Sequence, residues 1–189
     1  MKKNNMFVGA AILVVAIAAV VVIVLTQGGG SSSGGDKTAT VKPTYKVVAA
    51  CKAFTLKDAE AVLGAGAAAG TTNGSSDTSS DDVAVSTCSY SSGSSQDVQT
   101  TKTVTVLARS AKSSAGAASN KAVFGKDKPV GKQDVPGVGD AAFWDSEMSQ
   151  LDILQGNNWY IIGNMTGTHS NSGTLETSRA VFEQVKSKL

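Results

Sequence analysis

The hydrophobic pattern of this chain begins with one uninterrupted apolar stretch. Met6–Leu25 contains 20 residues that carry no charge and have only apolar or small side chains. A helix of that length spans about 30 Å, which matches the hydrocarbon core of a lipid bilayer. The pattern therefore predicts a single transmembrane helix that anchors the protein in the cell membrane.

The charges that flank this stretch predict its orientation. Lys2 and Lys3 lie in the short segment 1–5, and no charge follows the apolar stretch before Asp36. The positive-inside bias then places the N-terminus in the cytoplasm and the C-terminal domain outside the cell. A cleaved signal peptide is the alternative, but its apolar region would be about 7–15 residues long and would end in a small-residue cleavage site.

The rest of the chain divides into a linker and a domain. Segment 26–45 is rich in Gly, Ser and Thr and has few apolar positions, a composition typical of a flexible linker. Segment 46–189 mixes apolar and polar positions as a folded domain does, and about 140 residues can bury a core without metals. We therefore expect one extracytoplasmic domain on a flexible linker.

Three segments of the domain have helical patterning. Thr55 and Asp58 predict an N-cap with a capping box for a helix that ends at Gly64. A weaker helix is predicted at Ser110–Phe124 and an amphipathic one at Thr174–Leu189. The apolar stripes of these last two helices are Ala111, Ala115, Ala118 and Ala122, and Leu175, Phe182, Val185 and Leu189.

Alternating apolar and polar positions predict the strands, and short turns between them predict hairpins. Ala65–Asp82 is small and polar throughout and is predicted to be a loop. The expected fold class is α+β: a two-layer antiparallel sheet with helices on one face, preceded by the single transmembrane helix. The predicted strands are Val47–Ala50, Val83–Tyr90, Val98–Arg109, Ala141–Trp144, Leu151–Leu154 and Trp159–Met165.

The charge balance limits the partners of the domain. The formal net charge is +2, with 17 Lys and Arg residues against 15 Asp and Glu residues. All the acidic residues follow Leu25, so Lys2 and Lys3 account for the excess of basic residues. A neutral domain lacks the positive surface that a phosphate backbone requires, and we therefore expect no binding of nucleic acid.

The chain contains two cysteines, Cys51 and Cys88. In a domain outside the cytoplasm, two cysteines most simply form one disulfide. A reactive thiol and a metal site are the alternatives, and the single histidine of the chain makes a metal site a poor fit. We expect a disulfide that joins the first helix to the first long strand, with no metal ligands and no cofactor.

Two features that resemble chemical motifs are better explained as loops. His169 lies in a polar loop, and the chain has no G-x-S-x-G motif, so we predict no catalytic residue. Gly137–Ala142 matches G-x-G-x-x-A, but a dinucleotide motif needs a strand before it and a helix after it. Because Pro136 precedes this segment and Phe143 and Trp144 follow it, the segment is interpreted as a turn.

The largest side chains of the domain are Trp144, Trp159 and Tyr160, on neighbouring predicted strands. They belong either to the sheet core or to a surface for a ligand or partner, since Trp and Tyr dominate many interfaces. Alternation places Trp159 and Tyr160 on opposite faces, so one of them is a candidate for exposure. Four nearby acidic residues are interpreted as a solvated face: Asp140, Asp145, Glu147 and Asp152.

Several motifs from Cys51 onward carry a resemblance to a protein family. They are Cys51 with Phe54-Thr55 and Leu63-Gly64, then Cys88-Ser89-Tyr90, the run Val135–Trp144, and the hairpin from Leu151 through Gly156. With these motifs the chain resembles the small, functionally uncharacterised envelope lipoproteins and anchored sensor-like proteins of Gram-positive, especially actinobacterial, bacteria. The resemblance implies an α+β sheet domain outside the membrane and supplies no catalytic residues. This chain differs in having an apolar helix where many such proteins have a lipid-modified cysteine.

These observations lead to one expected function and two alternatives. We expect a non-enzymatic, membrane-anchored module that binds a protein, an envelope polymer or an apolar ligand outside the cell. One alternative is an accessory or structural subunit of a membrane or envelope complex, which would act through Met6–Leu25 as well as through the domain. The other is an envelope hydrolase, which would need polar residues that converge in a cleft.

Overall fold

The structure, a computed structural model, describes residues 44–69, 74–75, 79–93, 99–128, 131–169 and 171–189. The predicted anchor Met6–Leu25 and the linker up to residue 43 lie outside the described residues. Residues Val41–Leu189 group into one compact unit. In the described part of the chain, no helix has both the length and the apolar character needed to cross a membrane.

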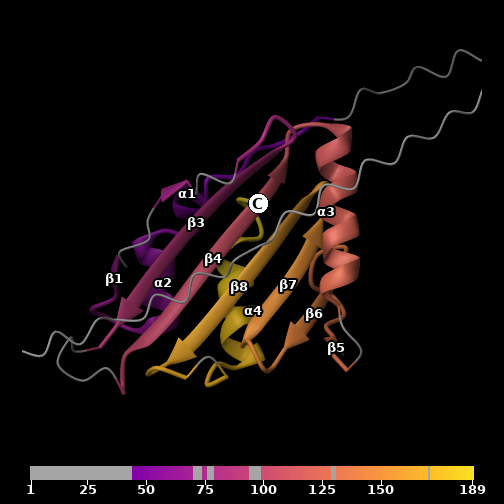
Figure 1. Cartoon of the computed structure of the whole chain (residues 1–189). Coiled ribbons are helices and arrows are strands. Elements are labelled where there is room, and N and C mark those ends of the chain that lie inside the picture. Colours follow the sequence, from indigo (N-terminus) through magenta and orange to yellow (C-terminus); the bar gives the residue numbers. More distant parts are fainter. Residues whose placement is uncertain (1–43, 70–73, 76–78, 94–98, 129–130, 170) are drawn as a thin grey trace, which may run out of the picture. The chain divides into compact units, whose positions relative to one another are not determined.

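Within these residues, eight strands form one antiparallel sheet in the order β1-β3-β4-β8-β7-β6-β5, and β2 also pairs with β3 (Figure 1). The α+β class and the antiparallel sheet predicted from the sequence are confirmed. The strands are β1 (Ala68–Ala69), β2 (Gly74–Ser75), β3 (Val83–Ser92), β4 (Lys102–Ala111), β5 (Gln133–Asp134), β6 (Ala141–Asp145), β7 (Gln150–Gln155) and β8 (Asn158–Thr166). The helices are α1 (Ala50–Ala53), α2 (Leu56–Leu63), α3 (Ser114–Asp127) and α4 (Leu175–Val185).

Two predicted hairpins form the middle of the sheet. Strands β3 and β4 pair with Cys88 opposite Val106. Strands β7 and β8 pair around a two-residue turn in which Gly156 has a positive φ of 59°. The hairpins are joined where β4 pairs with β8, with Val106 also opposite Ile162. The alternation of apolar residues is therefore in register across three strands, which gives the sheet a continuous apolar face.

One face of the sheet packs against α1, α2 and α4 and forms the larger core. Figure 1 shows α4 crossing behind β8 and β7. Each fully buried aliphatic side chain contributes about 1.5–3 kcal/mol, so this layer supplies much of the stability of the fold. Its most deeply buried members include Phe54, Val104, Val106, Leu151, Ile153, Tyr160, Ile162, Val181 and Val185.

The opposite face of the sheet is covered by α3, which corrects the prediction that all helices lie on one face. Phe124 of α3 packs with Phe143 and Trp159, and the rings of Phe124 and Phe143 have centroids 5.2 Å apart. The physical reason is that β6 and β8 are apolar on both faces. Phe143 and Trp144 are neighbours on β6, and Trp159 and Tyr160 are neighbours on β8, so each pair places a large apolar side chain on both faces of the sheet. Both faces must therefore be covered by other parts of the domain.

The buried side of α3 also differs from the predicted alanine stripe. Gly116, Asn120 and Phe124 face inward, and a Cβ atom at Gly116 would lie only 2.0 Å from the carbonyl oxygen of Asp82. Helix α3 therefore approaches the backbone of Asp82 closely at Gly116, and this contact determines which side of the helix is buried. Ala111 ends β4, and the other alanines of the predicted stripe are exposed: Ala115, Ala118 and Ala122.

The predicted strand Val47–Ala50 is wrong, because Ala50 begins the short helix α1. Side-chain hydroxyl groups accept the hydrogen bonds that a neighbouring strand would have accepted. The backbone N–H of Val48 donates to the Ser110 hydroxyl at 3.0 Å, and that of Ala50 donates to the Ser86 hydroxyl at 3.0 Å. The segment thus packs across the sheet without joining it.

The predicted loop Ala65–Asp82 contains two short strands. Ala68 lies opposite Ser91, and Gly74 lies opposite Thr87, so both pieces extend the sheet beyond β3. The low apolar content of this segment does not indicate strands, because β1 and β2 are held by backbone hydrogen bonds to the edge of β3 and not by the burial of apolar side chains.

The side-chain cap predicted for α2 is present, and α4 has a side-chain cap as well. In α2, the Thr55 side chain accepts from the Asp58 backbone N–H, and the Asp58 carboxylate accepts from the Thr55 N–H at 2.8 Å. This is the expected capping box. In α4, the Thr174 side chain accepts from the backbone N–H of Thr177 at 3.2 Å, so the helix begins after Thr174.

Candidate functional site

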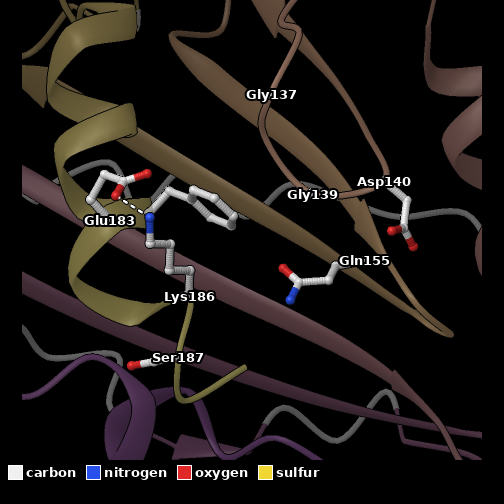
Figure 2. Close-up of a pocket in the computed structure, with 8 residues that line it drawn as sticks. Gly137, Gly139, Asp140, Gln155, Glu183, Lys186 and Ser187 are labelled. Atoms are coloured by element: carbon white, nitrogen blue, oxygen red, sulfur yellow. Dashed lines mark hydrogen bonds and ion pairs between the residues drawn. The ribbon is translucent and has the colours of Figure 1, made fainter.

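An open groove of about 510 Å³ lies between α4 and the loop that precedes β6. Figure 2 shows its two walls: Glu183, Lys186 and Ser187 on and after α4, and Gly139 and Asp140 on the loop. The side chain of Gln155, at the end of β7, lies between the two walls. The groove thus joins residues that lie more than 40 positions apart in the sequence.

The loop wall is fixed by glycine and by hydrogen bonds to the β7–β8 hairpin. Gly139 has a φ of 57°, and a Cβ atom there would lie 2.6 Å from Ile153 and 2.7 Å from the Leu154 carbonyl oxygen. The Asp140 backbone N–H donates to that carbonyl at 2.8 Å, and the Asp140 carboxylate accepts from the Gly156 N–H at 2.6 Å. The carboxylate is therefore held in place at the rim of the groove.

The helical wall presents an aromatic ring and two opposite charges. Phe182 is only 4% exposed, so most of its ring belongs to the core and little of it faces the groove. The next residue, Glu183, forms an ion pair with Lys186, three positions further along the chain. Because both side chains are about half exposed, this pair adds little to stability, and its charges remain available to a ligand.

The side chain of Gln155 has an unusual environment for a polar group. Its Oε1 atom is buried, and among the described residues it accepts no hydrogen bond. Leaving a buried acceptor unpaired costs about 1–3 kcal/mol, so such atoms call for an explanation. This orphaned oxygen lies in a residue that lines the groove, which makes Gln155 a candidate binding residue.

The predicted disulfide between Cys51 and Cys88 is present, with Cα atoms 4.9 Å apart. Cys88 is fully buried in β3, and Cys51 lies in α1 and is partly exposed. The bond fastens α1 to the sheet, on the face that also carries α4.

The candidate aromatic surface of Trp144, Trp159 and Tyr160 lies in the core. The exposed fractions are 7%, 2% and 1%, so none of the three offers a surface to a ligand or partner. Trp159 and Tyr160 do point to opposite faces, but α3 and α4 cover both. Burial raises the pKa of the Tyr160 phenol, and a hydrogen bond from Asn158 acts in the opposite direction.

The four acidic residues near these aromatic side chains do not form a single solvated face. Asp152 is 5% exposed and accepts a hydrogen bond from the Trp159 indole N–H at 3.0 Å, so it is not part of a solvated face. Asp145 and Glu147 share Lys132, and the hydrogen bond with Asp145 raises the pKa of that lysine. Only Asp140 reaches the groove.

In the part of the chain that the structure describes, His169 is not buried beside a serine and a carboxylate. This residue is exposed, and its backbone carbonyl accepts a hydrogen bond from the Ser172 hydroxyl at 2.7 Å. In the segment Gly137–Ala142, the first four residues form a turn and the last two begin β6, so a strand and not a helix follows the turn. Over the described ranges, no group of three or more His, Cys, Asp or Glu side chains is placed to hold a metal ion.

The turn beside the groove can be predicted from the glycines of the Gly137–Ala142 segment. Nothing in the local sequence indicates that Gln155, Glu183 and Lys186 lie close to it. Comparison with protein-family models, with curated proteins and with solved structures finds no match to this chain.

Proposed function

We propose that this protein is a membrane-anchored, extracytoplasmic, non-catalytic binding module. The observation that carries the proposal is the Cys51–Cys88 disulfide. Disulfides form and persist in oxidising compartments and are rare in the cytosol. Together with the uncharged stretch Met6–Leu25, the disulfide supports a domain outside the cell that is held by a single-pass anchor. The resemblance to envelope proteins of Gram-positive bacteria supports the same location.

The binding role is supported by the groove between α4 and the Gly137–Asp140 loop. Its polar groups come from three elements, and one of them, Gln155, has an oxygen without a partner. The aromatic residues that were the other candidates are buried. The groove is therefore the place where this domain would contact an envelope component or a protein.

The location is tested with a maleimide reagent that cannot cross membranes, applied to intact cells that express the full chain. We expect labelling of Cys51, whose side chain is partly exposed, only after a brief reduction, because the disulfide blocks its thiol until then. A Cys51→Ser/Cys88→Ser variant is the control for nonspecific labelling. Labelling without reductant would contradict the disulfide, and labelling only after lysis would contradict the orientation.

The binding role is tested with a photo-crosslinking amino acid at position 186, in native membranes. The matched control carries the same amino acid at Lys121, an exposed position on α3 on the other side of the sheet. We expect a defined cross-linked product from position 186 and none from position 121. The same products from both positions would mean that the groove is not a binding site. Cross-links from the anchor to a stable protein partner would favour the accessory-subunit alternative.

A further inference from the structure

The groove is lined by both hydrogen-bond acceptors and hydrogen-bond donors. Asp140 and Glu183 bring carboxylates, Gln155 brings its unpaired amide oxygen, and Lys186 and Ser187 bring donors. Figure 2 shows these groups arranged around one open space, with Gln155 between the two walls. A ligand that fits this set must donate several hydrogen bonds and also accept some.

The nature of the polar groups narrows the ligand class. An anionic ligand would meet the carboxylates of Asp140 and Glu183, and only Lys186 would favour it. An apolar ligand would find little ring surface, because Phe182 is 4% exposed. A hydroxyl group is both donor and acceptor and carries no charge, so it suits a mixed set of this kind.

On this basis, we propose that the groove binds a neutral saccharide segment of an envelope polysaccharide. This inference rests on the proposed function, because such polymers are found outside the cell membrane. The volume of about 510 Å³ and the open form of the groove suit part of an extended chain better than an enclosed small molecule.

The rim of the groove is already organised for this ligand. The Asp140 carboxylate is held by the Gly156 N–H at 2.6 Å, and the Glu183 carboxylate is held by the Lys186 ammonium group. Fixed polar groups lose little conformational freedom on binding, which favours affinity. The Gln155 oxygen is covered in the free protein, and a side-chain rotation of the kind that is common on binding would turn it toward a sugar hydroxyl.

The test is affinity electrophoresis of the full chain through native gels cast with dextran, mannan or galactan. The detergent is a polyoxyethylene ether, because a sugar-based detergent would compete for the groove. Alginate gels serve as the anionic comparison. We expect at least one of the neutral polysaccharides to retard the protein, and alginate to retard it less.

Two variants locate the binding at the groove. Glu183→Ala is expected to weaken retardation about tenfold in apparent Kd, the usual effect of losing one hydrogen bond to a charged group. Glu176→Ala is the matched control, since it removes the same charge from the same helix at an exposed position outside the groove. Gln155→Met is expected to weaken binding as well and to raise Tm by about 2–6 °C, because it removes an unpaired buried oxygen.

The opposite results would overturn the inference. These are no retardation in the three neutral gels, retardation by alginate alone, or equal effects of Glu183→Ala and Glu176→Ala. A lower Tm for Gln155→Met would likewise show that Gln155 has a structural role. A protein cross-linked at position 186 without any retardation would overturn the saccharide inference and leave the proposed function in place. Labelling of the thiols only after lysis would contradict the location outside the cell, and with it the proposed function itself.

Discussion

Asn164 and Thr174 exchange two hydrogen bonds across the sheet–helix junction. The Thr174 backbone N–H donates to the Asn164 amide oxygen at 2.8 Å, and the Asn164 amide nitrogen donates to the Thr174 carbonyl at 2.9 Å. The same nitrogen also donates to the Ser178 hydroxyl at 2.8 Å. One buried side chain of β8 thus fixes the start of α4, and with it the helical wall of the groove.

Replacing this asparagine is expected to loosen α4. Asn164→Ala removes three hydrogen bonds and leaves the Thr174 backbone N–H without its acceptor, so we expect it to lower the free energy of unfolding by about 1–3 kcal/mol. Urea denaturation followed by circular dichroism measures the change. Asn171→Ala, at an exposed position in the loop before α4, is the control and should change stability by less than about 0.5 kcal/mol. Equal effects of the two substitutions would contradict this role of Asn164.

The disulfide is expected to be a large contributor to stability. It closes a loop of 38 residues, since its sequence separation is 37, and in the chain-entropy model such a loop contributes about 4 kcal/mol. Cys51→Ala/Cys88→Ala should lower the free energy of unfolding by about that amount. Adding reductant should destabilise the native protein and leave the double variant unchanged. A reductant effect on the double variant would show that the loss does not come from this bond.

Asp58 is expected to make stability depend on pH in the acid range. Burial acts to raise its pKa, but the ammonium group of Lys188 at 2.6 Å and the hydrogen bonds from Thr55 outweigh burial, so the pKa is lowered. A group with a lowered pKa in the folded state stabilises the protein above its unfolded pKa of about 3.9. The stabilisation is lost as the pH falls through the folded value.

The variant Asp58→Asn isolates this contribution. At neutral pH it should be less stable than the native protein by about 0.5–2 kcal/mol, because it loses the ion pair with Lys188 and the negative charge in the first turn of α2. The difference should shrink as the pH falls below about 4, where the native carboxyl is protonated as well. Chemical denaturation at pH 7 and pH 3 measures both values. A difference that is constant with pH would mean that the charge of Asp58 plays no part.

The sequence predicted those parts of the fold that depend on neighbouring residues. The Thr55–Asp58 capping box needs four consecutive positions, and the turn at Gly156 needs a glycine between two alternating segments; both are present. The Cys51–Cys88 disulfide was predicted from the presence of two cysteines and from the expected location outside the cytoplasm. In each of these cases the physical cause is visible in the local sequence or in the composition.

The parts that were missed depend on contacts between distant residues. Which side of α3 is buried follows from the approach of Gly116 to Asp82, and periodicity alone favoured the alanines. The groove needs α4 to lie beside the Gly139–Asp140 loop, and nothing in either segment indicates the other. The unpaired oxygen of Gln155 appears only when all its neighbours are in place. Functional groups of this kind are the ones for which sequence patterns carry the least signal.

The two glycines of α3, Gly116 and Gly125, lie in different surroundings, so replacing each of them tests how the helix packs against the rest of the domain. A Cβ atom at Gly116 would lie 2.0 Å from the Asp82 carbonyl oxygen, whereas no atom lies within 4 Å of the corresponding position at Gly125. Alanine favours a helix over glycine by about 0.5–1 kcal/mol at an unconstrained site. We therefore expect Gly125→Ala to raise the free energy of unfolding by about that amount.

Gly116→Ala should have the opposite sign. The contact with backbone cannot be relieved by a side-chain rotation, so α3 must shift away from the sheet, and overpacking of this kind costs about 1–3 kcal/mol. Urea denaturation of the two variants gives the comparison within one helix, where the change in helix propensity is the same. If Gly116→Ala also stabilised the protein, α3 would not approach Asp82 closely. Helix α3 would then have to pack over Phe143 and Trp159 in a different position.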